Sequence, residues 1–398
     1  MSEAAPGALR SHVSSAAARS RSALRRSVRG APRRERRVFA AAAFGFAAVL
    51  PLLLGEGSSA MHNMVLAAAY VIMALGLNIV VGFAGLLDLG YVAFFAIGAH
   101  VAGHFGSAFW AGAGDGAGIA LFVGEPAASM PGIHFNFLII LVLAIIATTI
   151  AGVLIGVPTL RLRGDYVGIV TLAFGEIIGQ VAANGREIEL FGGSLTGGSG
   201  GMSAIDKIDL PFLERFGALD LRPWYWFALT LVVLMLFVNF RLRDSRMGRA
   251  WIALRDDEGA AACAGVPIVR TKLLAYGAGA ALGGVSGAFL ASYLSTVNPN
   301  QFTYSFSIFI LAMIVLGGLG SIWGVVVGAI ILSAINHYLL PEVLYGVPGN
   351  LGLDFDLSEI SSGIYGFLLV IIMLLRPEGL LPERRHRTTL GLQERQHA

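Results

Sequence analysis

Residues 135–157 read FNFLIILVLAIIATTIAGVLIGV, a run of 23 residues without a charged side chain. A helix rises about 1.5 Å per residue, so this run is long enough to cross a hydrocarbon core about 30 Å thick. Over all 398 residues, 56% are apolar and 13% are charged, about half the usual charged share of soluble domains. This composition excludes a disordered protein, a coiled coil and almost any soluble enzyme of this length. The expected fold class is all-α, a polytopic bundle of transmembrane helices.

Working outward from this run, we expect about ten membrane spans. They are 38–55, 62–82, 89–109, 135–157, 165–184, 224–240, 271–294, 303–318, 322–340 and 359–375. The stretch 303–340 fits either two full helices or a re-entrant pair. Glycines cluster at 82–85 and 317–320, where helices can approach closely or break within the membrane, or where the chain makes plain tight turns.

Basic residues indicate the orientation of the spans. If the N-terminus is cytoplasmic and the spans alternate, 24 of the 28 Lys and Arg residues fall on the cytoplasmic side, and the other four lie in 185–223. Cytoplasmic loops carry an excess of Lys and Arg. We therefore expect both termini in the cytoplasm and the loop 185–223 in the periplasm.

The same reasoning divides the chain into three parts. Residues 1–37 hold ten Arg and no Lys, and we expect a disordered basic tail there. The transmembrane domain should cover 38–383, followed by a second cytoplasmic tail at 384–398.

The most informative loop is 241–270, which we place in the cytoplasm. It contains a helix-forming run from Arg249 to Ala264, ended by Gly265 and Pro267. An acidic cluster precedes a face of small residues, a combination suited to insertion into a groove on a partner protein. The alternative is an ordinary solvated loop helix. We expect docking to involve Arg255, Asp256, Asp257, Glu258, Ala260, Ala261 and Gly265.

Several motifs resemble one known family. The order Glu258-x-Ala260-Ala261-x-x-x-Gly265 resembles the coupling loop of ABC importer permeases. The wider match is to the LivM type of branched-chain amino acid permease, within the LivH/LivM family. It extends in order from about residue 60 to 383, through the stretches 75–98, 163–178, 195–202, 315–321 and 375–382.

This resemblance implies an inner-membrane, multi-pass permease subunit of an ATP-driven importer for Leu, Ile and Val. It also implies the partners: a second permease of the LivH type, two ATPase subunits of the LivG/LivF type and a periplasmic binding protein. No cofactor is expected on this chain, because it lacks a phosphate-binding Gly-x-x-x-x-Gly-Lys-[Ser/Thr] motif and ATP would bind the partner ATPases. Importers of urea and short amides have similar permeases, so that substrate class stays open.

Polar residues at membrane depth are candidates for the transport pathway. They are Asn78, Asp88, Thr171 and Glu176. An intramembrane carboxylate is costly and indicates function by default. Asp88 could instead cap a helix, and Glu176 could bond within the bundle to Thr171 or Gln180. A secondary transporter would need such residues for ion coupling, but it would leave the loop 241–270 unexplained.

The remaining reactive residues carry less information. His100 and His104 are four residues apart, and we interpret them as structural rather than as metal ligands. We expect the single cysteine, Cys263, to be a small buried apolar residue. No nucleophile–base pair for an intramembrane enzyme is visible, so neither catalysis nor metal binding is expected.

Overall fold

The computed structural model describes the chain within 44–382. The ranges described are 44–52, 55, 58–111, 118–124, 131–160, 162, 164, 166–190, 193–209, 216–217, 220–343, 363, 366–367, 370–371, 374, 376 and 378–382. The chain forms two units, one up to Gly55 and the other from Glu56 onward. Within the first unit, residues 44–52 are helical, in the region of the first expected span. Most of the expected last span, 359–375, lies outside the described residues.

Helices dominate the second unit, and eight of them correspond to eight expected spans. Their bounds are α3 Ser59–Leu77, α4 Val92–Phe105, α5 Phe137–Thr159, α6 Tyr166–Asn184, α7 Arg222–Asp244, α10 Ile268–Leu294, α11 Tyr304–Gly317 and α12 Ile322–Ala334. Among the described residues, six helical stretches are long and apolar enough to cross a membrane, whereas α4 and α11 are shorter. The polytopic helical bundle is therefore confirmed, and the count of ten spans stays a prediction.

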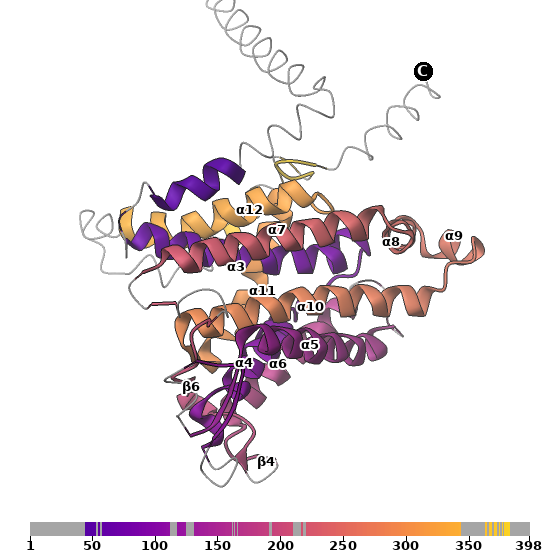
Figure 1. Ribbon diagram of the computed structural model, residues 1–398. Coiled ribbons are helices and arrows are strands. Elements are labelled where there is room, and N and C mark those ends of the chain that lie inside the picture. Colours follow the sequence, from indigo (N-terminus) through magenta and orange to yellow (C-terminus); the bar gives the residue numbers. More distant parts are fainter. Residues whose placement is uncertain are drawn as a thin grey trace, which may run out of the picture. The chain divides into compact units, whose positions relative to one another are not determined.

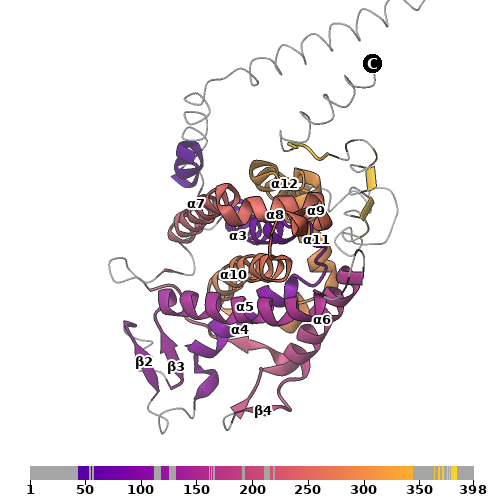
Figure 2. The same ribbon diagram turned by 90° about the vertical axis from the view of Figure 1, so that its right-hand side faces the viewer.

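Helix α10 forms the centre of the second unit. It lies between a layer that contains α3, α7 and α12 and a layer of α4, α5 and α6 (Figures 1 and 2). Glycines make this position possible, because a Cβ at Gly279 would meet Gly76 of α3, and a Cβ at Gly287 would meet the backbone of Phe95 in α4. Backbones can approach this closely only where no side chain intervenes.

Two of the helices continue into wider π-helical turns. Helix α3 extends through η1, Asn78–Phe83, and α12 extends through η6, Ile335–Val343. Helix α12 and η6 together form a continuous helical path from Ile322 to Val343, while α11 has only 14 residues. Helices α11 and α12 pack together through glycines, since a Cβ at Gly328 of α12 would meet the backbone of Met313 of α11. The N–H groups of Leu380 and Leu381 bind the otherwise open carbonyls of Leu316 and Gly317 at the end of α11.

Short strands gather at one end of the second unit, which we call the sheet end. Strands β1 (Gly106–Ser107), β3 (Ile133–Phe135) and β2 (Ile119–Leu121) form one sheet, and β4 (Glu189–Leu190) pairs with β5 (Gly193–Ser194). Strand β6 (Met202–Ser203) pairs with β7 (Thr296–Val297), which joins two loops far apart in sequence. The buried ring of His134 in β3 contacts Asp206, with 2.6 Å between Nδ1 and Oδ2.

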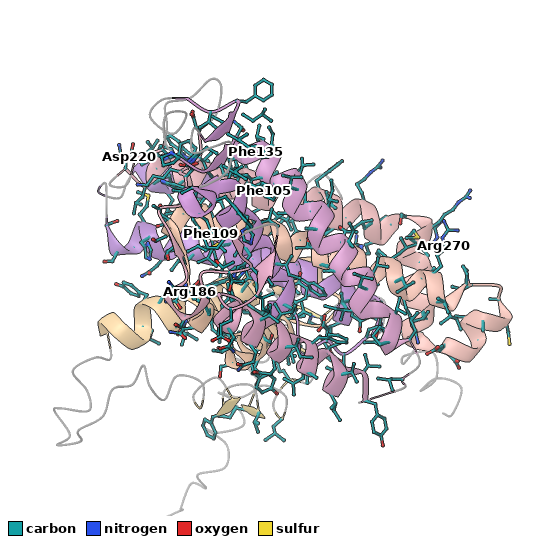
Figure 3. All side chains as sticks on the ribbon, turned by 90° about the horizontal axis from the view of Figure 1, so that it is seen from below. Phe105, Phe109, Phe135, Arg186, Asp220 and Arg270 are labelled. Atoms are coloured by element: carbon teal, nitrogen blue, oxygen red, sulfur yellow. The ribbon has the colours of Figure 1, made fainter. Side chains whose placement is uncertain are left out.

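The opposite end carries α8 (Arg246–Asp256) and α9 (Glu258–Cys263), and we call it the α8–α9 end. Figure 3 shows Arg270 near this end, far from Phe105, Phe135, Asp220 and Arg186. The three loops joined at the sheet end, around 106–136, 185–221 and 295–303, are all ones that the charge pattern assigns to the periplasm. The fold thus brings together at one end the loops that the distribution of basic residues assigns to one side of the membrane.

Candidate functional site

The loop 241–270 contains two helices where the sequence predicts one from Arg249 to Ala264. Helix α8 begins after Ser245, whose hydroxyl accepts the N–H of Gly248 at 3.2 Å. It ends at Asp256, and Asp257 is extended, with φ −159° and ψ 113°. The Asp257 carboxylate then accepts the N–H of Ala260 at 2.9 Å and so caps α9. Side-chain competition of this kind starts a new helix in place of a continuous one.

Gly265 ends α9 in the left-handed conformation, with φ +84°. The N–H of Val266 binds the carbonyl of Ala261, and the N–H of Gly265 binds that of Ala262. This is the paired bond pattern of a Schellman motif, which favours Gly at this position. The requirement for Gly265 is therefore conformational, because a Cβ there would meet no atom within 4 Å.

The small residues of α9 divide between two faces. Ala261 is buried against the protein, while Ala260, Ala262 and Ala264 are exposed. Cys263 is exposed as well, so the expectation of a buried cysteine is wrong. It lies in the last turn of α9, a helix that projects from the bundle and packs against it with one face only (Figure 1).

The acidic cluster is largely engaged within the chain itself. Both carboxylate oxygens of Glu258 lie 2.9 Å from Nζ of Lys272, the buried lysine in the first turns of α10. Asp256 lies 3.7 Å from Nε of Arg255, a longer and more exposed pair. Glu258 thus attaches α9 to α10 of the helix bundle, and part of its carboxylate stays exposed. Lys272 was not among the predicted site residues, although a lone lysine in an apolar helix is a visible signal.

Arg255 connects α8 with the break that follows α3. Its guanidinium donates to the carbonyl of Gly82 in η1. Its aliphatic stem covers Gly85, which has φ +70°, and a Cβ at Gly85 would lie 2.5 Å from Cγ of Arg255. Arg255 of α8 is therefore bound to the segment in which the chain turns from α3 towards α4.

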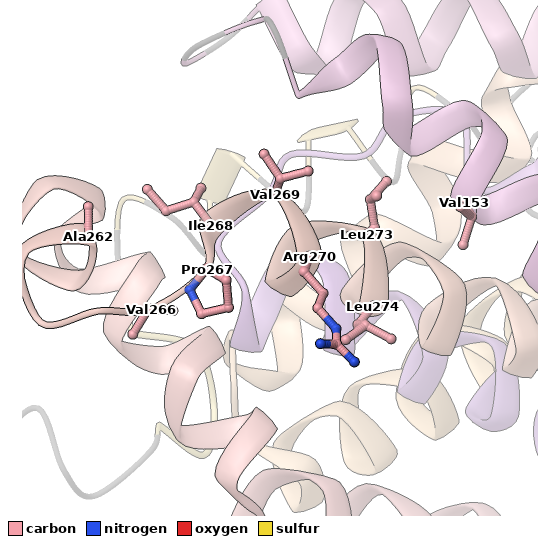
Figure 4. Close-up of a pocket in the computed structure, with 9 residues that line it drawn as sticks. All are labelled: Val153, Ala262, Val266, Pro267, Ile268, Val269, Arg270, Leu273 and Leu274. Carbon is pink, nitrogen blue, oxygen red and sulfur yellow. The ribbon is translucent and has the colours of Figure 1, made fainter.

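An open groove of about 700 Å³ lies beside α9 at the start of α10. Figure 4 shows its lining, which is apolar except for one arginine: Val153, Ala262, Val266, Pro267, Ile268, Val269, Arg270, Leu273 and Leu274. Arg270 is exposed and belongs to the first turn of α10. The exposed side of α9 and this groove form one continuous surface at the α8–α9 end.

Asn78 is buried where α3 becomes η1. Its Oδ1 accepts the N–H of Gly320 at 3.0 Å, which attaches the α11–α12 turn to the break after α3. Gly82 is required beside it, because a Cβ there would meet the Asn78 amide and the N–H of Gly320. The two glycine clusters of the sequence, 82–85 and 317–320, are thus brought together by one amide side chain.

Asp88 and Thr171 meet across the segment between η1 and α4. The Asp88 carboxylate is buried and accepts the N–H of Gly90 at 3.0 Å, while its other oxygen has no hydrogen-bond partner. The Thr171 hydroxyl accepts the N–H of Leu89 at 3.0 Å and donates to the carbonyl of Gly168. Asp88 therefore binds the backbone N–H of Gly90 and does not cap α4, whose N-cap residue Tyr91 makes no side-chain cap bond.

Glu176 is exposed on α6, so the alternative of a bond to Thr171 or Gln180 is not met. Thr171 bonds to the backbone, and the Gln180 side chain accepts from Asn184. The glycines on either side of Glu176 allow close neighbours, because Gly175 packs on Gly90 and Gly179 on Phe302. Helix α6 presents a stripe to the outside that contains Ile169, Ala173, Glu176, Ile177 and Gln180.

The neighbouring helix α5 offers a contrast. Its exposed stripe is wholly apolar and consists of Leu138, Val142, Ile146, Ile150, Leu154 and Val157. Such a surface suits contact with lipid chains, whereas a stripe with a carboxylate in its middle does not. Asn78, Asp88 and Thr171 therefore belong to one buried region around the break after α3, and Glu176 belongs to a separate outward surface.

The two spaced histidines each bond within the chain. Nδ1 of His100 lies 2.8 Å from the carbonyl of Ala96, and Nδ1 of His104 accepts the indole N–H of Trp110 at 3.1 Å. Within the described part of the chain, no three metal-ligating side chains come together.

Comparisons with known proteins agree with this architecture. The profile of the family described as "Branched-chain amino acid transport system / permease component" matches residues 59–373. The high-affinity branched-chain amino acid transport system permease protein LivM of Escherichia coli is 35% identical over 380 residues, which cover 89% of this chain and 77% of LivM. LivM of Salmonella typhimurium matches to the same extent.

More distant relatives cover less of the chain. LivH of Escherichia coli is 31% identical over 37% of this chain and 43% of its own length. The L-arabinose transport system permease protein AraH of Escherichia coli is 30% identical over 31% of this chain and 40% of its own. No solved structure matches the chain. From the profile match and the similarity to LivM along most of both chains, this chain belongs to the family of branched-chain amino acid transport system permease components, and it is of the LivM type.

Proposed function

We propose that this chain is the membrane-embedded permease subunit of an ATP-driven importer that takes Leu, Ile and Val into the cell across the inner membrane. A periplasmic binding protein would deliver the amino acid, a LivH-type subunit would complete the passage, and two ATPase subunits of the LivG/LivF type would supply the energy and bind the ATP. The family membership and the similarity to LivM and LivH support this assignment.

The observation that carries the proposal is that α8 and α9 of the loop 241–270 are bonded to the membrane-spanning helix bundle. Helices α8 and α9 project from the bundle, and α9 exposes small side chains that a groove on an ATPase could receive. Glu258 is bound to Lys272 of α10, and Arg255 is bound to Gly82 beside the break. A displacement of α8 and α9 would therefore move both the central helix and the turn between α3 and α4.

The break itself has the features of a movable element. The π-helical turn η1 and the glycines beside it allow the backbone to bend, and π turns recur at functional sites. The buried polar groups Asn78, Asp88 and Thr171 surround this bend. We infer that the inward and outward states of the permease differ in how these groups pair, so that Asn78 and Thr171 exchange partners when the bend moves.

The test separates transport from ATP hydrolysis in the assembled complex. Arg255→Met keeps an aliphatic stem over Gly85 and removes the donor to the Gly82 carbonyl. Arg249→Met is the matched control, because Arg249 lies on the same helix and its guanidinium donates to the nearby Asp244 carbonyl at 2.9 Å. We expect Arg255→Met to lower leucine uptake per ATP hydrolysed by about tenfold, the effect of roughly 1.4 kcal/mol.

Assembly with the ATPase subunits should be unchanged in both variants, since the guanidinium of Arg255 points into the permease. Urea and acetamide should fail to compete with leucine for uptake by the wild-type complex. Equal uptake per ATP in the two variants would show that Arg255 does not transmit the movement. Uptake of urea in place of leucine would overturn the substrate assignment.

A further inference from the structure

A second hollow, separate from the groove beside α9, lies in the bundle near the sheet end. It has a volume of about 300 Å³, at the lower end of the range for sites that hold small molecules. Its wall is built from α3, α4, α10, α11 and η6, together with the 3-10 turn η5 (Pro299–Gln301). Because η5 follows strand β7, the hollow opens towards the sheet end.

The inner part of the hollow is apolar and buried. It is lined by Leu66, Tyr70, Phe95, Leu290 and Phe309, all of which are less than one-tenth exposed. The aromatic rings pack at their edges, with 5.7 Å between the ring centres of Tyr70 and Phe309. Aromatic rings make favourable contacts with aliphatic side chains and with ammonium groups.

The mouth of the hollow is polar and uncharged. It is formed by Asn300, Gln301, Thr303 and Ser305, which are exposed, and by the half-buried Asn336. Amide and hydroxyl groups both donate and accept, so they can bind an ammonium and a carboxylate at the same time. Among the described residues that line the hollow, none is Asp, Glu, Lys or Arg. A ligand with a net charge would therefore find no counter-charge there.

We propose that this hollow is a transfer site for one zwitterionic amino acid with a branched aliphatic side chain, entered from the sheet end. The aliphatic side chain would occupy the buried aromatic part, and the ammonium and carboxylate would bind the uncharged mouth. The absence of an ion pair keeps binding weak, as a site in a transport pathway requires, because the solute must leave as readily as it enters. The π-helical turn η6 carries Asn336 at the mouth, so movement of this turn would open or narrow the site.

This inference rests on the proposed function, and the experiment distinguishes the two. The probe is photo-leucine, a diazirine analogue of leucine, applied to the full complex in membrane vesicles, with the labelled positions mapped by peptide mass spectrometry. We expect labels on Tyr70, on Phe309 or on Phe306, which also lines the hollow. Excess unlabelled leucine should reduce the labelling, and lysine or glutamate should not. The same vesicles are assayed for leucine uptake.

Two variants of neighbouring residues supply the matched comparison. Ser305→Trp places a ring in the mouth of the hollow, whereas Tyr304→Trp changes an exposed neighbour on the same helix that does not line it. We expect Ser305→Trp to reduce both labelling and uptake about tenfold or more, with ATP hydrolysis retained, because the ring occupies the space of the ligand. Tyr304→Trp should behave as wild type.

In one outcome, vesicles take up leucine and yet show no label at these positions that excess leucine reduces. That result would overturn the transfer site and leave the proposed function intact. The same holds if Ser305→Trp and Tyr304→Trp label equally, or if the label is insensitive to leucine, as a hollow filled by lipid would give. Vesicles that take up no leucine at all would instead overturn the proposed function.

Discussion

At the scale of single residues, the ion pair between Glu258 and Lys272 has two consequences for how the loop can be studied. Lys272 is buried and Glu258 is about half exposed, so removal of the carboxylate leaves a buried ammonium without its partner. Loss of one member of a pair costs more the deeper the remaining charge lies. A charge reversal at Glu258 therefore disturbs the permease itself before any ATPase is present.

We expect Glu258→Gln to lower the unfolding free energy of the purified permease by about 1–3 kcal/mol, between the values for exposed and buried pairs. Glu258→Lys should cost more, because two ammonium groups would then face each other. Thermal unfolding in detergent measures both variants.

The control is the double variant Glu258→Lys with Lys272→Glu, which exchanges the positions of the two charges. It should recover most of the lost stability, since the attraction is restored. If leucine uptake recovers with it, the carboxylate acts only within the permease. If stability returns and uptake does not, Glu258 contacts the ATPase directly.

At the scale of helices, α6 presents the surface that the proposed LivH-type partner would cover. Glu176 is the eleventh of the 19 residues of α6, which places it near the middle of the helix. A carboxylate at that depth costs about 2–4 kcal/mol if it faces lipid. We therefore expect the α6 stripe to face the second permease subunit, with Glu176 beside the passage between the two.

This placement can be tested by cross-linking on a Cys263→Ala background. Glu176→Cys should cross-link to the second permease subunit through a short bifunctional maleimide, and Ile146→Cys on the apolar stripe of α5 should not. Glu176→Gln should lower uptake while leaving the amount of assembled complex unchanged. Equal cross-linking from both positions, or full uptake by Glu176→Leu, would remove Glu176 from the interface and the passage.

Packing of α10 through its glycines predicts opposite effects for two similar substitutions. Gly287→Ala should lower the amount of folded permease, at a cost of about 1–3 kcal/mol, because its Cβ would meet the backbone of Phe95, which cannot move aside. Gly277→Ala should be tolerated or slightly stabilising, since its Cβ would lie 3.3 Å from the side-chain end of Thr149 and alanine favours helix. Expression and thermal unfolding of the two variants check this; equal stability would mean that α4 and α10 are not in close contact.

At the scale of the whole molecule, the orientation in the membrane follows from the basic residues and from the exposed Cys263. A membrane-impermeant maleimide should modify Cys263 in inside-out vesicles and not in intact cells, because α9 is expected in the cytoplasm. On a Cys263→Ala background, Lys207→Cys should show the reverse. Modification of Cys263 from outside would invert the topology.

The sequence by itself determined the class of protein and the positions of most helices. Apolar runs are local in sequence, so α5, α6, α10 and α11 begin and end within about three residues of the expected spans. The helical loop 241–270, its termination at Gly265 and the family were also recognisable from local motifs.

Only the tertiary structure decided what the polar side chains bind. Arg255 and Gly82 lie 173 residues apart, and Asn78 and Gly320 lie 242 apart, so no local pattern could pair them. The division of the loop helix at Asp257 depends on a cap that competes with an otherwise uninterrupted helical run. The exposure of Glu176 and the hollow lined by Tyr70 and Phe309 arise from the way separate helices pack, because burial is a property of the assembled helices and not of any one of them.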